Sequence, residues 1–318
     1  MPIMPGSRGA VSLEDARDFF ANLDAGRRMI IKAVAGGGGR GVRIVEDWSA
    51  LEEAWTRCRS EAEAAFGKPD VYVEAYLDNA RHVEVQVVGD GTGRIIHLGD
   101  RDCSVQRRQQ KIIEIASAPG LLPETRAALA DAAIRLGQAS HYTNIGTFEF
   151  LVDNKQPERF MFMEANPRLQ VEHTITEMVA GVDLVALQLR LASGETLEAI
   201  DLPESPRPSG MVRINMETML PDGSALPGGG VIERFNPPSG PGIRVDTFGY
   251  PGYSTNPRFD SLLAKVIVHH RQPDFEALLK RCYRALCEFD VAGVPTNLDF
   301  TKNLVQHPDI EALNYHTR

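Results

Sequence analysis

Four consecutive glycines at residues 36–39 lie between two strand-like segments, and this context limits the folds open to the chain. Residues 27–35 are rich in apolar side chains, and residues 41–47 begin with alternating apolar and charged side chains. The glycine run fits the pattern G-x-G-x-x-G, but dinucleotide-binding proteins need a helix directly after that pattern. The P-loop sequence G-x-x-x-x-G-K-[ST] is absent. The sequence therefore predicts a glycine-rich hairpin tip.

A tip of this kind can place backbone N–H groups around phosphate oxygens, as other glycine-rich loops do. Lys32 lies on the strand before the tip and could reach the same phosphates. An ordinary flexible hairpin explains the glycines equally well, so the loop by itself leaves both interpretations open. The candidate phosphate-binding residues are Lys32, Gly36, Gly37, Gly38, Gly39 and Gly41.

A second feature is a pair of carboxylates in a predicted hairpin formed by residues 146–153 and 159–166. Glu149 and Glu164 lie in opposite strands, each among apolar neighbours, where unpaired charge is costly. They would repel one another unless a cation lies between them. Asn166 is two residues beyond Glu164 and shares its face if the strand continues. These three oxygen ligands suit Mg²⁺, with phosphate oxygens completing its coordination.

Polar side chains recur at every second position from Glu164 to Glu172. We interpret this series as an active-site ridge that continues the strand, with Arg168 binding an oxyanion and Glu172 acting as a base. The alternative is an exposed strand edge of alternating polarity, although Pro167 already interrupts regular strand structure.

A local cluster of basic residues lies between the glycine loop and the carboxylates. Residues 101–111 contain four cationic side chains in a chain whose net charge is −9. Such a cluster favours an anionic substrate, and a solvated turn is the alternative. The cations are Arg101, Arg107, Arg108 and Lys111.

The overall composition excludes several classes of function. The net charge gives no general reason to bind nucleic acid, and no apolar run reaches the length of a membrane span. The four cysteines have no C-x-x-C spacing, which favours reduced, structural thiols and a cytoplasmic protein. They are Cys58, Cys103, Cys282 and Cys287.

Capping signals and hydrophobic periodicity predict the remaining elements. Ser12 with Asp15, and Ser49 with Glu52, resemble capping boxes at the starts of two helices. Gly67 is expected to end the second of these. A strand hairpin is predicted over residues 82–103, and the proline-rich residues 201–210 mark a boundary. Further helices are predicted over residues 123–140, 176–195 and 274–289.

Taken together, these segments resemble the biotin carboxylase component of biotin-dependent carboxylases, a branch of the ATP-grasp superfamily. The resemblance runs in the family's order over almost the whole chain. It implies an α+β ATP-grasp fold with a lid subdomain at residues 1–78 and a core at 79–204. A mixed α/β biotin carboxylase C-terminal domain is implied at residues 205–318. The matching segments are IIKAVAGGGGRGVRIV, EAYLDNARHVEVQVVGDGTG, GDRDCSVQRRQQKIIEIASAPG, GTFEFL, MEANPRLQVEHTITEMVAGVDL, GIRVDTFGYPGYSTNPRFDSLLAKVI and GVPTNLDF.

The resemblance also implies a reaction. ATP phosphorylates bicarbonate to carboxyphosphate, and the carboxyl group then passes to biotin on a carrier domain, with Mg²⁺ or Mn²⁺ as the metal. The implied partners are bicarbonate, the biotinylated carrier domain, the carboxyltransferase domain of a parent enzyme and a second copy of the chain. Nucleic acid and membrane are not expected, and the implied compartment is the cytoplasm, or the mitochondrial matrix for a eukaryotic parent.

Residue roles follow from the resemblance in the same way. Glu74, Leu77 and Leu151 would line the adenine pocket, and His82 and Gln106 would contact the nucleotide. Glu172 would be the general base, and Arg168 would also stabilise the biotin enolate. The residues implied to gather bicarbonate and biotin are Lys111, Arg168, Gln170, Val171 and Arg244.

The sequence departs from the family at three points, one of which is a segment before Arg213 that is a few residues shorter than usual. Gln109 stands where family members usually have a histidine, so we assign it no catalytic role. Family members also have an N-terminal pre-grasp domain before the point where this sequence starts, so we expect the chain to be a fragment of a larger carboxylase. Two other functions stay open at this stage. One is a different ATP-grasp ligase that forms an acylphosphate, and the other is a non-catalytic ATP-binding or assembly module.

Overall fold

The computed structural model describes residues 1–24, 26–36, 40–199, 208–270 and 272–317. Helices and antiparallel sheets are mixed along the chain, which confirms the α+β class. The chain divides into two units that are described separately below. One contains residues 1–78 with 161–163, and the other contains residues 79–160 with 164–318.

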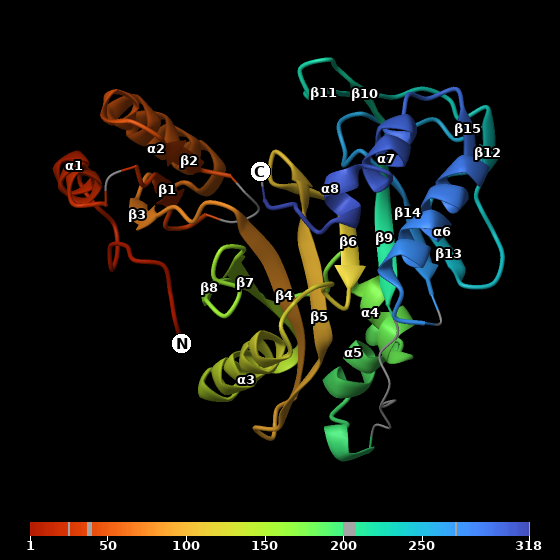
Figure 1. The fold of residues 1–318 in the computed structure, drawn as a ribbon, viewed down its shortest axis with the longest axis horizontal. Coiled ribbons are helices and arrows are strands. Elements are labelled where there is room, and N and C mark those ends of the chain that lie inside the picture. Colours follow the sequence, from red (N-terminus) through yellow and green to blue (C-terminus); the bar gives the residue numbers. More distant parts are fainter. Residues whose placement is uncertain (25, 37–39, 200–207, 271, 318) are drawn as a thin grey trace. The chain divides into compact units, whose positions relative to one another are not determined.

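The first unit is a three-stranded sheet covered by two helices (Figure 1). Its strand order is β2-β1-β3, and β1 pairs with β2 in antiparallel fashion on either side of the glycines. The predicted strand–loop–strand context is therefore confirmed, whereas Gly37, Gly38 and Gly39 lie outside the described residues. The elements are α1 (Leu13–Ala21), β1 (Met29–Ala33), β2 (Val42–Val45), η1 (Trp48–Ala50), α2 (Leu51–Phe66) and β3 (Val71–Ala75).

The helix ends of this unit test the predicted caps. Ser12 and Asp15 form the expected capping box at α1, and Gly67 ends α2 in the left-handed conformation at φ +70°. The capping box predicted for Ser49 and Glu52 is wrong. Asp47 instead accepts hydrogen bonds from the backbone N–H groups of Ser49 and Ala50, and a 3-10 turn leads into α2.

Asp47→Ala is expected to destabilise the chain by about 1 kcal/mol, because two backbone donors lose their acceptor. Ser49→Ala is expected to cost less, since the Ser49 hydroxyl caps no helical N–H group. Urea unfolding of both variants, followed by far-UV circular dichroism, measures the difference. A larger loss for Ser49→Ala would contradict the assignment of the cap to Asp47.

The second unit is built on an eight-stranded antiparallel sheet of order β13-β14-β9-β6-β5-β4-β7-β8. Two small two-stranded sheets, β10-β11 and β12-β15, accompany it. The strands of the large sheet are β4 (Ala80–Asp90), β5 (Ile95–Arg107), β6 (Gln110–Ala116), β7 (Thr143–Asp153), β8 (Phe160–Asn166), β9 (Ser209–Asn215), β13 (Ile243–Thr247) and β14 (Leu262–His269). The short strands are β10 (Glu217–Met219), β11 (Ala225–Pro227), β12 (Arg234–Asn236) and β15 (Asp290–Ala292).

Helices cover both faces of this sheet (Figure 1). On one face α3 lies beside β4 and β5 and α6 beside β9 and β14, and on the other face α4 lies across β5, β6 and β9. The strands alternate accordingly, because successive side chains point to opposite faces. In β9, Met211 packs with α4, whereas Val212 and Ile214 pack with α6. The helices are α3 (Pro123–Ala139), α4 (His173–Ala180), α5 (Leu184–Ala192), α6 (Phe275–Glu288), α7 (Leu298–Val305) and α8 (Pro308–Glu311), with a 3-10 turn η2 (Leu197–Ala199).

The single helix predicted over residues 176–195 is wrong, because two helices occupy this segment. Gly181 ends α4 in the left-handed conformation at φ +66°. Asp183 then caps α5 by accepting a hydrogen bond from the N–H group of Ala186. The hydrophobic period continues across the break, which is why periodicity alone joined the two helices.

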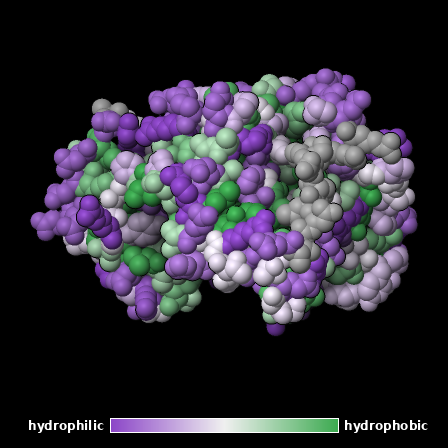
Figure 2. Space-filling model, turned by 90° about the horizontal axis from the view of Figure 1, so that it is seen from below, coloured by the Kyte–Doolittle hydropathy of each residue, from purple (hydrophilic) through white to green (hydrophobic). Residues whose placement is uncertain are grey.

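The molecular surface is mixed in character. Figure 2 shows hydrophilic residues over much of one face, with hydrophobic residues in separate patches between them. Among the described helices, none combines the length and hydropathy of a membrane span. All four cysteines are free thiols, as predicted. The boundary predicted between residues 204 and 205 lies outside the described residues.

Candidate active site

Charged side chains gather on the sheet face that α4 covers. Strand register places Glu84 of β4 opposite Arg101 of β5 on one side and opposite Glu149 of β7 on the other. Glu114 of β6 lies opposite Met211 of β9. Arg213 is two residues after Met211, so its side chain is on the same face of the sheet. Charged side chains from five strands therefore share one face with the N-terminus of α4.

Glu84 and Arg101 form a fully buried ion pair. Both side chains are 0% exposed, and Nε of Arg101 lies 2.5 Å from a carboxylate oxygen of Glu84. Arg101 also donates to Gln86 and Thr176. Burial alone would raise the pKa of Glu84, but the charges of Arg101 and Lys111 lower it to about 2. Glu84 is therefore a fixed negative charge at neutral pH.

Lys111 is the cation that joins the carboxylates. Its Nζ donates to Glu84 at 2.7 Å, forms a short hydrogen bond with Glu172, and lies 3.7 Å from Glu149. Burial alone would lower the pKa of Lys111, but the surrounding carboxylates hold it well above its ordinary value. The ammonium group is therefore permanently charged, and the three carboxylates all lie close to its Nζ atom.

The three predicted metal ligands come together where the end of β8 lies beside the middle of β7. The side-chain amide of Asn166 donates to Glu149 at 2.7 Å and to Glu164 at 3.2 Å. Glu149 is buried and also contacts His82 at 2.7 Å, whereas Glu164 is exposed. Burial would raise the pKa of Glu149, but its interactions with His82 and Lys111 lower it to about 2. Two carboxylates and an amide fit a hard divalent cation, for which the amide would turn its oxygen inward.

The predicted polar ridge is only partly correct, because the strand ends at Asn166. Pro167 cannot continue the ladder, and the next residues form a loop. Arg168 is exposed and donates to Gln170, whose own amide donates to Thr147. Glu172 is the N-cap residue of α4 and is 1% exposed. The loop therefore turns Glu172 into the buried cluster instead of leaving it on a strand edge.

Arg244 lies beside this cluster on β13 and is held by two carboxylates. It donates to Glu177 of α4 at 2.7 Å and to Asp246 at 2.8 Å. Lys265 contacts Asp246 at 3.1 Å and donates to the carbonyl oxygen of Val171 at 3.2 Å. These bonds fix the positions of two residues expected to gather bicarbonate and biotin, Val171 and Arg244.

The residues expected to contact nucleotide in the second unit are also neighbours. The side-chain amide of Gln106 lies 2.9 Å from Nδ1 of His82. Leu151 lies directly opposite His82 in the β4–β7 register. Because His82 also contacts Glu149, these positions adjoin the candidate metal site.

In the first unit, the structure brings two of the expected nucleotide ligands together. Lys32 of β1 donates to Glu74 of β3 at 2.5 Å. In the register Lys32 pairs with Tyr72 and Glu74 pairs with Ile30, so the two side chains are diagonal neighbours on one face of the sheet. Gly41 has φ +65°, and a Cβ there would lie 2.8 Å from the Cβ of Ala33, so a glycine is required. Gly36 lies just after β1, and Leu77 follows β3.

Glu84, Glu114 and Arg213 are site residues for which no role was predicted from the sequence. Glu84 lies among apolar residues of the predicted hairpin over residues 82–103, and Glu114 lies between Ile113 and Ile115, so both show the signal that indicated Glu149. Arg213 follows two apolar residues, and its partner Glu114 is 99 positions away. Strand alternation could have indicated that each of these charged side chains points to a buried face. It could not have indicated which of them form ion pairs.

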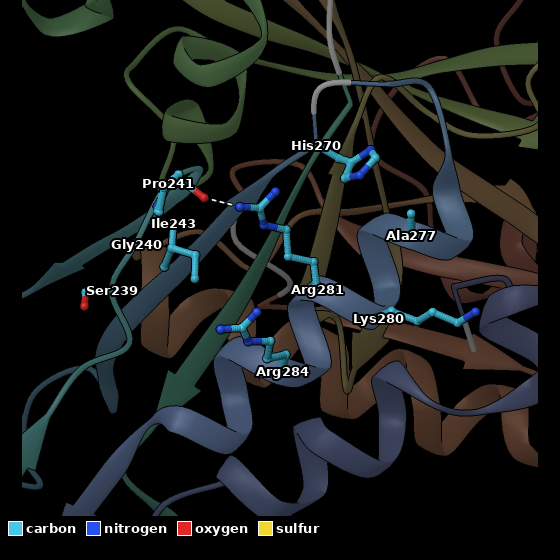
Figure 3. A pocket seen from close by; sticks show the side chains of 9 residues that line it. All are labelled: Ser239, Gly240, Pro241, Ile243, His270, Ala277, Lys280, Arg281 and Arg284. Carbon is cyan, nitrogen blue, oxygen red and sulfur yellow. Dashed lines mark hydrogen bonds between the residues drawn. The ribbon is translucent and has the colours of Figure 1, made fainter.

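A separate pocket of about 490 Å³ lies between α6 and residues 239–243. Figure 3 shows Arg281 pointing toward the loop, where it bonds the carbonyl oxygen of Pro241. Lys280 and Arg284 are paired with Glu276 and Glu288 of their own helix. None of the predicted site residues lines this pocket.

The geometry can be compared with known proteins. Residues 1–200 match the family described as the ATP-binding domain of the carbamoyl-phosphate synthase L chain, and residues 211–318 match the biotin carboxylase C-terminal domain. The chain is similar to biotin carboxylase 1 of Bacillus subtilis, at 42% identity over all of this chain and 70% of that protein. It is 41% identical to pyruvate carboxylase of Staphylococcus aureus, of which it spans 28%.

Solved structures show the same similarity. A biotin carboxylase–ATP complex from Campylobacter jejuni matches with a TM-score of 0.92 at 38% identity, covering all of this chain and 69% of that one. The biotin carboxylase domain dimer of a 2-oxoglutarate carboxylase from Hydrogenobacter thermophilus matches with the same TM-score, identity and coverage. It was solved with MgADP, ADP and bicarbonate.

Proposed function

The chain belongs to the biotin carboxylase family of the ATP-grasp superfamily, and on this basis we propose that it carboxylates biotin with bicarbonate and ATP. It would act as part of a larger carboxylase, as an ATP-dependent C–N ligase. The observation that carries the proposal is the buried carboxylate of Glu172, held between the ammonium of Lys111 and the guanidinium of Arg213. This arrangement supports Glu172 as the base, because the two cations beside it would attract bicarbonate.

Glu172 would act first, by taking the proton of bicarbonate onto a carboxylate oxygen. The bicarbonate oxygen then attacks the γ-phosphorus of ATP, and ADP leaves with the electron pair of the broken P–O bond. Lys111, Arg168 and Arg244 would stabilise the negative charge on the bicarbonate oxygens and on carboxyphosphate. The ureido nitrogen of biotin would then form a bond to the carboxyl carbon of carboxyphosphate as the C–O bond to phosphate breaks, and the departing phosphate would take the ureido N–H proton.

A divalent cation would be held by Glu149, Glu164 and Asn166, and it would neutralise charge on the phosphates of ATP. In the first unit, Lys32 and the glycine hairpin would bind phosphate, and Glu74 and Leu77 would line the adenine pocket. Within the second unit, Leu151, His82 and Gln106 would contact the nucleotide, and Gln170 and Val171 would contact bicarbonate and biotin. The proximity of His82, Glu149 and Lys111 supports these assignments.

Glu164→Gln is expected to weaken Mn²⁺ binding in the presence of ADP by about tenfold or more, because one charged ligand is lost. Glu164 is exposed, so the substitution is not expected to alter unfolding. Electron paramagnetic resonance counts free Mn²⁺ during a titration and gives the affinity directly. Glu158→Gln, an exposed control on the loop between β7 and β8, is expected to bind Mn²⁺ normally. Equal affinity in the Glu164 variant and the control would contradict the ligand set.

One observation distinguishes this function from another ATP-grasp ligase. The match to the carbamoyl-phosphate synthase ATP-binding domain covers residues 1–200. By itself this match is compatible both with biotin carboxylation and with another ATP-grasp ligase activity. The biotin carboxylase C-terminal domain at residues 211–318 favours biotin as acceptor. We also propose a biotinylated carrier domain and a carboxyltransferase domain as partners, and a dimer, by analogy with the multidomain and dimeric relatives.

The experiment that tests the proposed function is a measurement of ADP release by the chain with MgATP, bicarbonate and free biotin. Release that requires both bicarbonate and biotin supports it. ADP release at a rate that does not depend on bicarbonate would indicate a different ligase. Binding of MgATP without any turnover would instead support a non-catalytic module.

A further inference from the structure

A buried group of polar side chains leads from the C-terminal segment to His82, and the function proposed above does not use it. All of its members belong to the second unit, and each is 7% exposed or less. Polar groups at this depth need hydrogen-bond partners, because an unpaired buried group is costly. The bonds of each member therefore show what the group holds in place. The members are Arg81, Asp102, Ser104 and Tyr315.

Asp102 of β5 is the centre of the group. Its Oδ2 accepts two hydrogen bonds from Arg81, at 3.0 and 2.5 Å, and one from the Tyr315 hydroxyl at 2.9 Å. Its Oδ1 accepts from both the backbone N–H and the hydroxyl of Ser104, at 2.9 and 2.5 Å. Five bonds to two oxygens fix the orientation of the carboxylate, since rotation would break several of them at once.

Ser104 transmits this orientation to His82. A serine hydroxyl has one proton, and Ser104 donates it to Asp102, so the hydroxyl oxygen is left to accept. The backbone N–H of His82 donates to that oxygen at 2.9 Å. Among the described pairs of β4 with β5, the one nearest to His82 joins Val83 to Asp102. The Ser104 hydroxyl therefore takes the place of a strand carbonyl as the acceptor for His82.

The His82 ring in turn contacts two residues of the candidate site. Its Nε2 lies 2.7 Å from the carboxylate of Glu149, an expected metal ligand. Its Nδ1 lies 2.9 Å from the side-chain amide nitrogen of Gln106, an expected nucleotide contact. That nitrogen also donates to the carbonyl oxygen of Cys103 at 2.8 Å. A displacement of the His82 backbone would therefore disturb the metal and nucleotide contacts together.

Tyr315 connects the C-terminal segment to this network. Its ring packs in the hydrophobic core of the second unit, and its hydroxyl donates to Asp102. Two residues later, the N–H of Thr317 donates to the carbonyl oxygen of Ala80 at the start of β4. Arg81 lies over the Tyr315 ring, 5.8 Å from its centroid. The segment is therefore bonded to both strands that carry the expected nucleotide contacts.

We propose that Ser104 is a positioning residue for the nucleotide and metal site, and that Tyr315 acts on this site through Asp102 and Ser104. The phenol and the guanidinium hold the carboxylate, the carboxylate orients the hydroxyl, and the hydroxyl holds the backbone of His82. None of these side chains is among the residues proposed to contact ATP, bicarbonate or biotin. The effect on nucleotide rests on the proposed function, whereas the hydrogen bond to His82 does not.

Amide hydrogen exchange measured by NMR tests the bond to His82 without any substrate. In Ser104→Ala the His82 N–H loses its acceptor, and its exchange is expected to accelerate by about tenfold. In Tyr315→Phe the acceptor remains but is less firmly held, so an acceleration of about threefold is expected. Other amides of β4 are expected to keep their rates. A purely structural role would accelerate exchange along the whole strand.

A double variant tests the connection through Ser104. Adding Tyr315→Phe to Ser104→Ala is expected to cause no further change in His82 exchange. Tyr142→Phe removes a hydroxyl that donates to the carbonyl oxygen of Ile145 at 3.0 Å, and this matched control is expected to leave His82 exchange unchanged. Equal His82 exchange in wild type and Ser104→Ala, or additive effects in the double variant, would overturn the proposal. If Ser104→Ala does not fold, unchanged His82 exchange in Tyr315→Phe would overturn it.

Calorimetric titration with MgADP tests the effect on the nucleotide site. Ser104→Ala is expected to weaken MgADP binding by about tenfold, and Tyr315→Phe by less. In steady-state assays of Ser104→Ala, KM for ATP is expected to rise while kcat changes by less than about twofold. Wild-type affinity for MgADP in a variant with accelerated His82 exchange would overturn the positioning role. If the wild type binds no MgADP, the proposed function fails, while amide exchange still decides whether Ser104 holds His82.

Discussion

Glu172→Gln is expected to lower the rate of bicarbonate-dependent ADP release by about 10³-fold, within the range known for loss of a general base. Glutamine keeps the size of the side chain and can still accept a hydrogen bond from Lys111 or Arg213. It cannot take a proton from bicarbonate at neutral pH. KM for ATP is expected to change little, because the nucleotide ligands proposed above do not include Glu172.

A steady-state assay of ADP release at saturating ATP measures this effect. Glu195→Gln removes a carboxylate that pairs with Arg190 on the surface, and it is expected to retain full activity. Circular dichroism of the Glu172 variant shows whether the fold persists. Activity within tenfold of the wild type in folded Glu172→Gln protein would exclude Glu172 as the base.

Arg101→Met is expected to destabilise the chain by about 3–5 kcal/mol at neutral pH, because it leaves Glu84 buried without its main partner. Lys111 remains beside Glu84 but is shared with Glu172. The hydroxyl of Thr176 and the amide of Gln86 also lose a donor. Among the described ion pairs, this one has no solvent exposure on either side, so its loss cannot be compensated by water.

The loss of stability in Arg101→Met is expected to depend on pH because of the ionisation of Glu84. Its pKa in the folded wild type is about 2, below the ordinary value of 4.5, so its contribution to stability is complete above pH 4.5 and is lost as pH falls toward 2. In Arg101→Met the buried carboxylate of Glu84 can take up a proton more readily. As pH falls, this protonation removes the unpaired charge and reduces the destabilisation of the variant. The stability gap between wild type and variant is therefore expected to narrow on acidification.

Urea unfolding of both proteins at pH 7 and at about pH 4.5 measures the gap. Arg135→Met removes an exposed arginine paired with Asp131 on α3, and it is expected to cost no more than about 0.5 kcal/mol at either pH. A gap that stays constant with pH would show that Arg101 stabilises the fold by packing and not by its charge.

Local sequence signals predicted the parts of the fold that depend on neighbouring residues. The glycine hairpin was predicted because a strand pattern follows the glycines directly, and the structure pairs β1 with β2 there. The pair Glu149 and Glu164 was predicted because each carboxylate interrupts an apolar strand. The polar ridge failed beyond Asn166 because Pro167 ends the strand, and the spacing of polar residues carries no information about where the chain turns.

Contacts between distant segments could not be predicted in this way. Arg213 meets Glu114 and Glu172 only because β9 pairs with β6 beneath α4, and these residues are 99 and 41 positions from Arg213. Strand alternation indicates which side chains share a face, but the order β14-β9-β6-β5 decides which strands are neighbours. The pairing partners of Glu172 therefore required the structure.

The most direct test of the central proposal follows oxygen from bicarbonate into phosphate. The chain is incubated with MgATP, biotin and ¹⁸O-labelled bicarbonate, and the phosphate released is analysed by mass spectrometry. Because a bicarbonate oxygen attacks the γ-phosphorus and stays on it when the carboxyl group leaves, the account predicts one ¹⁸O atom per phosphate formed with ADP. ADP release accompanied by unlabelled phosphate would show that water, and not bicarbonate, is the acceptor, and would contradict the account.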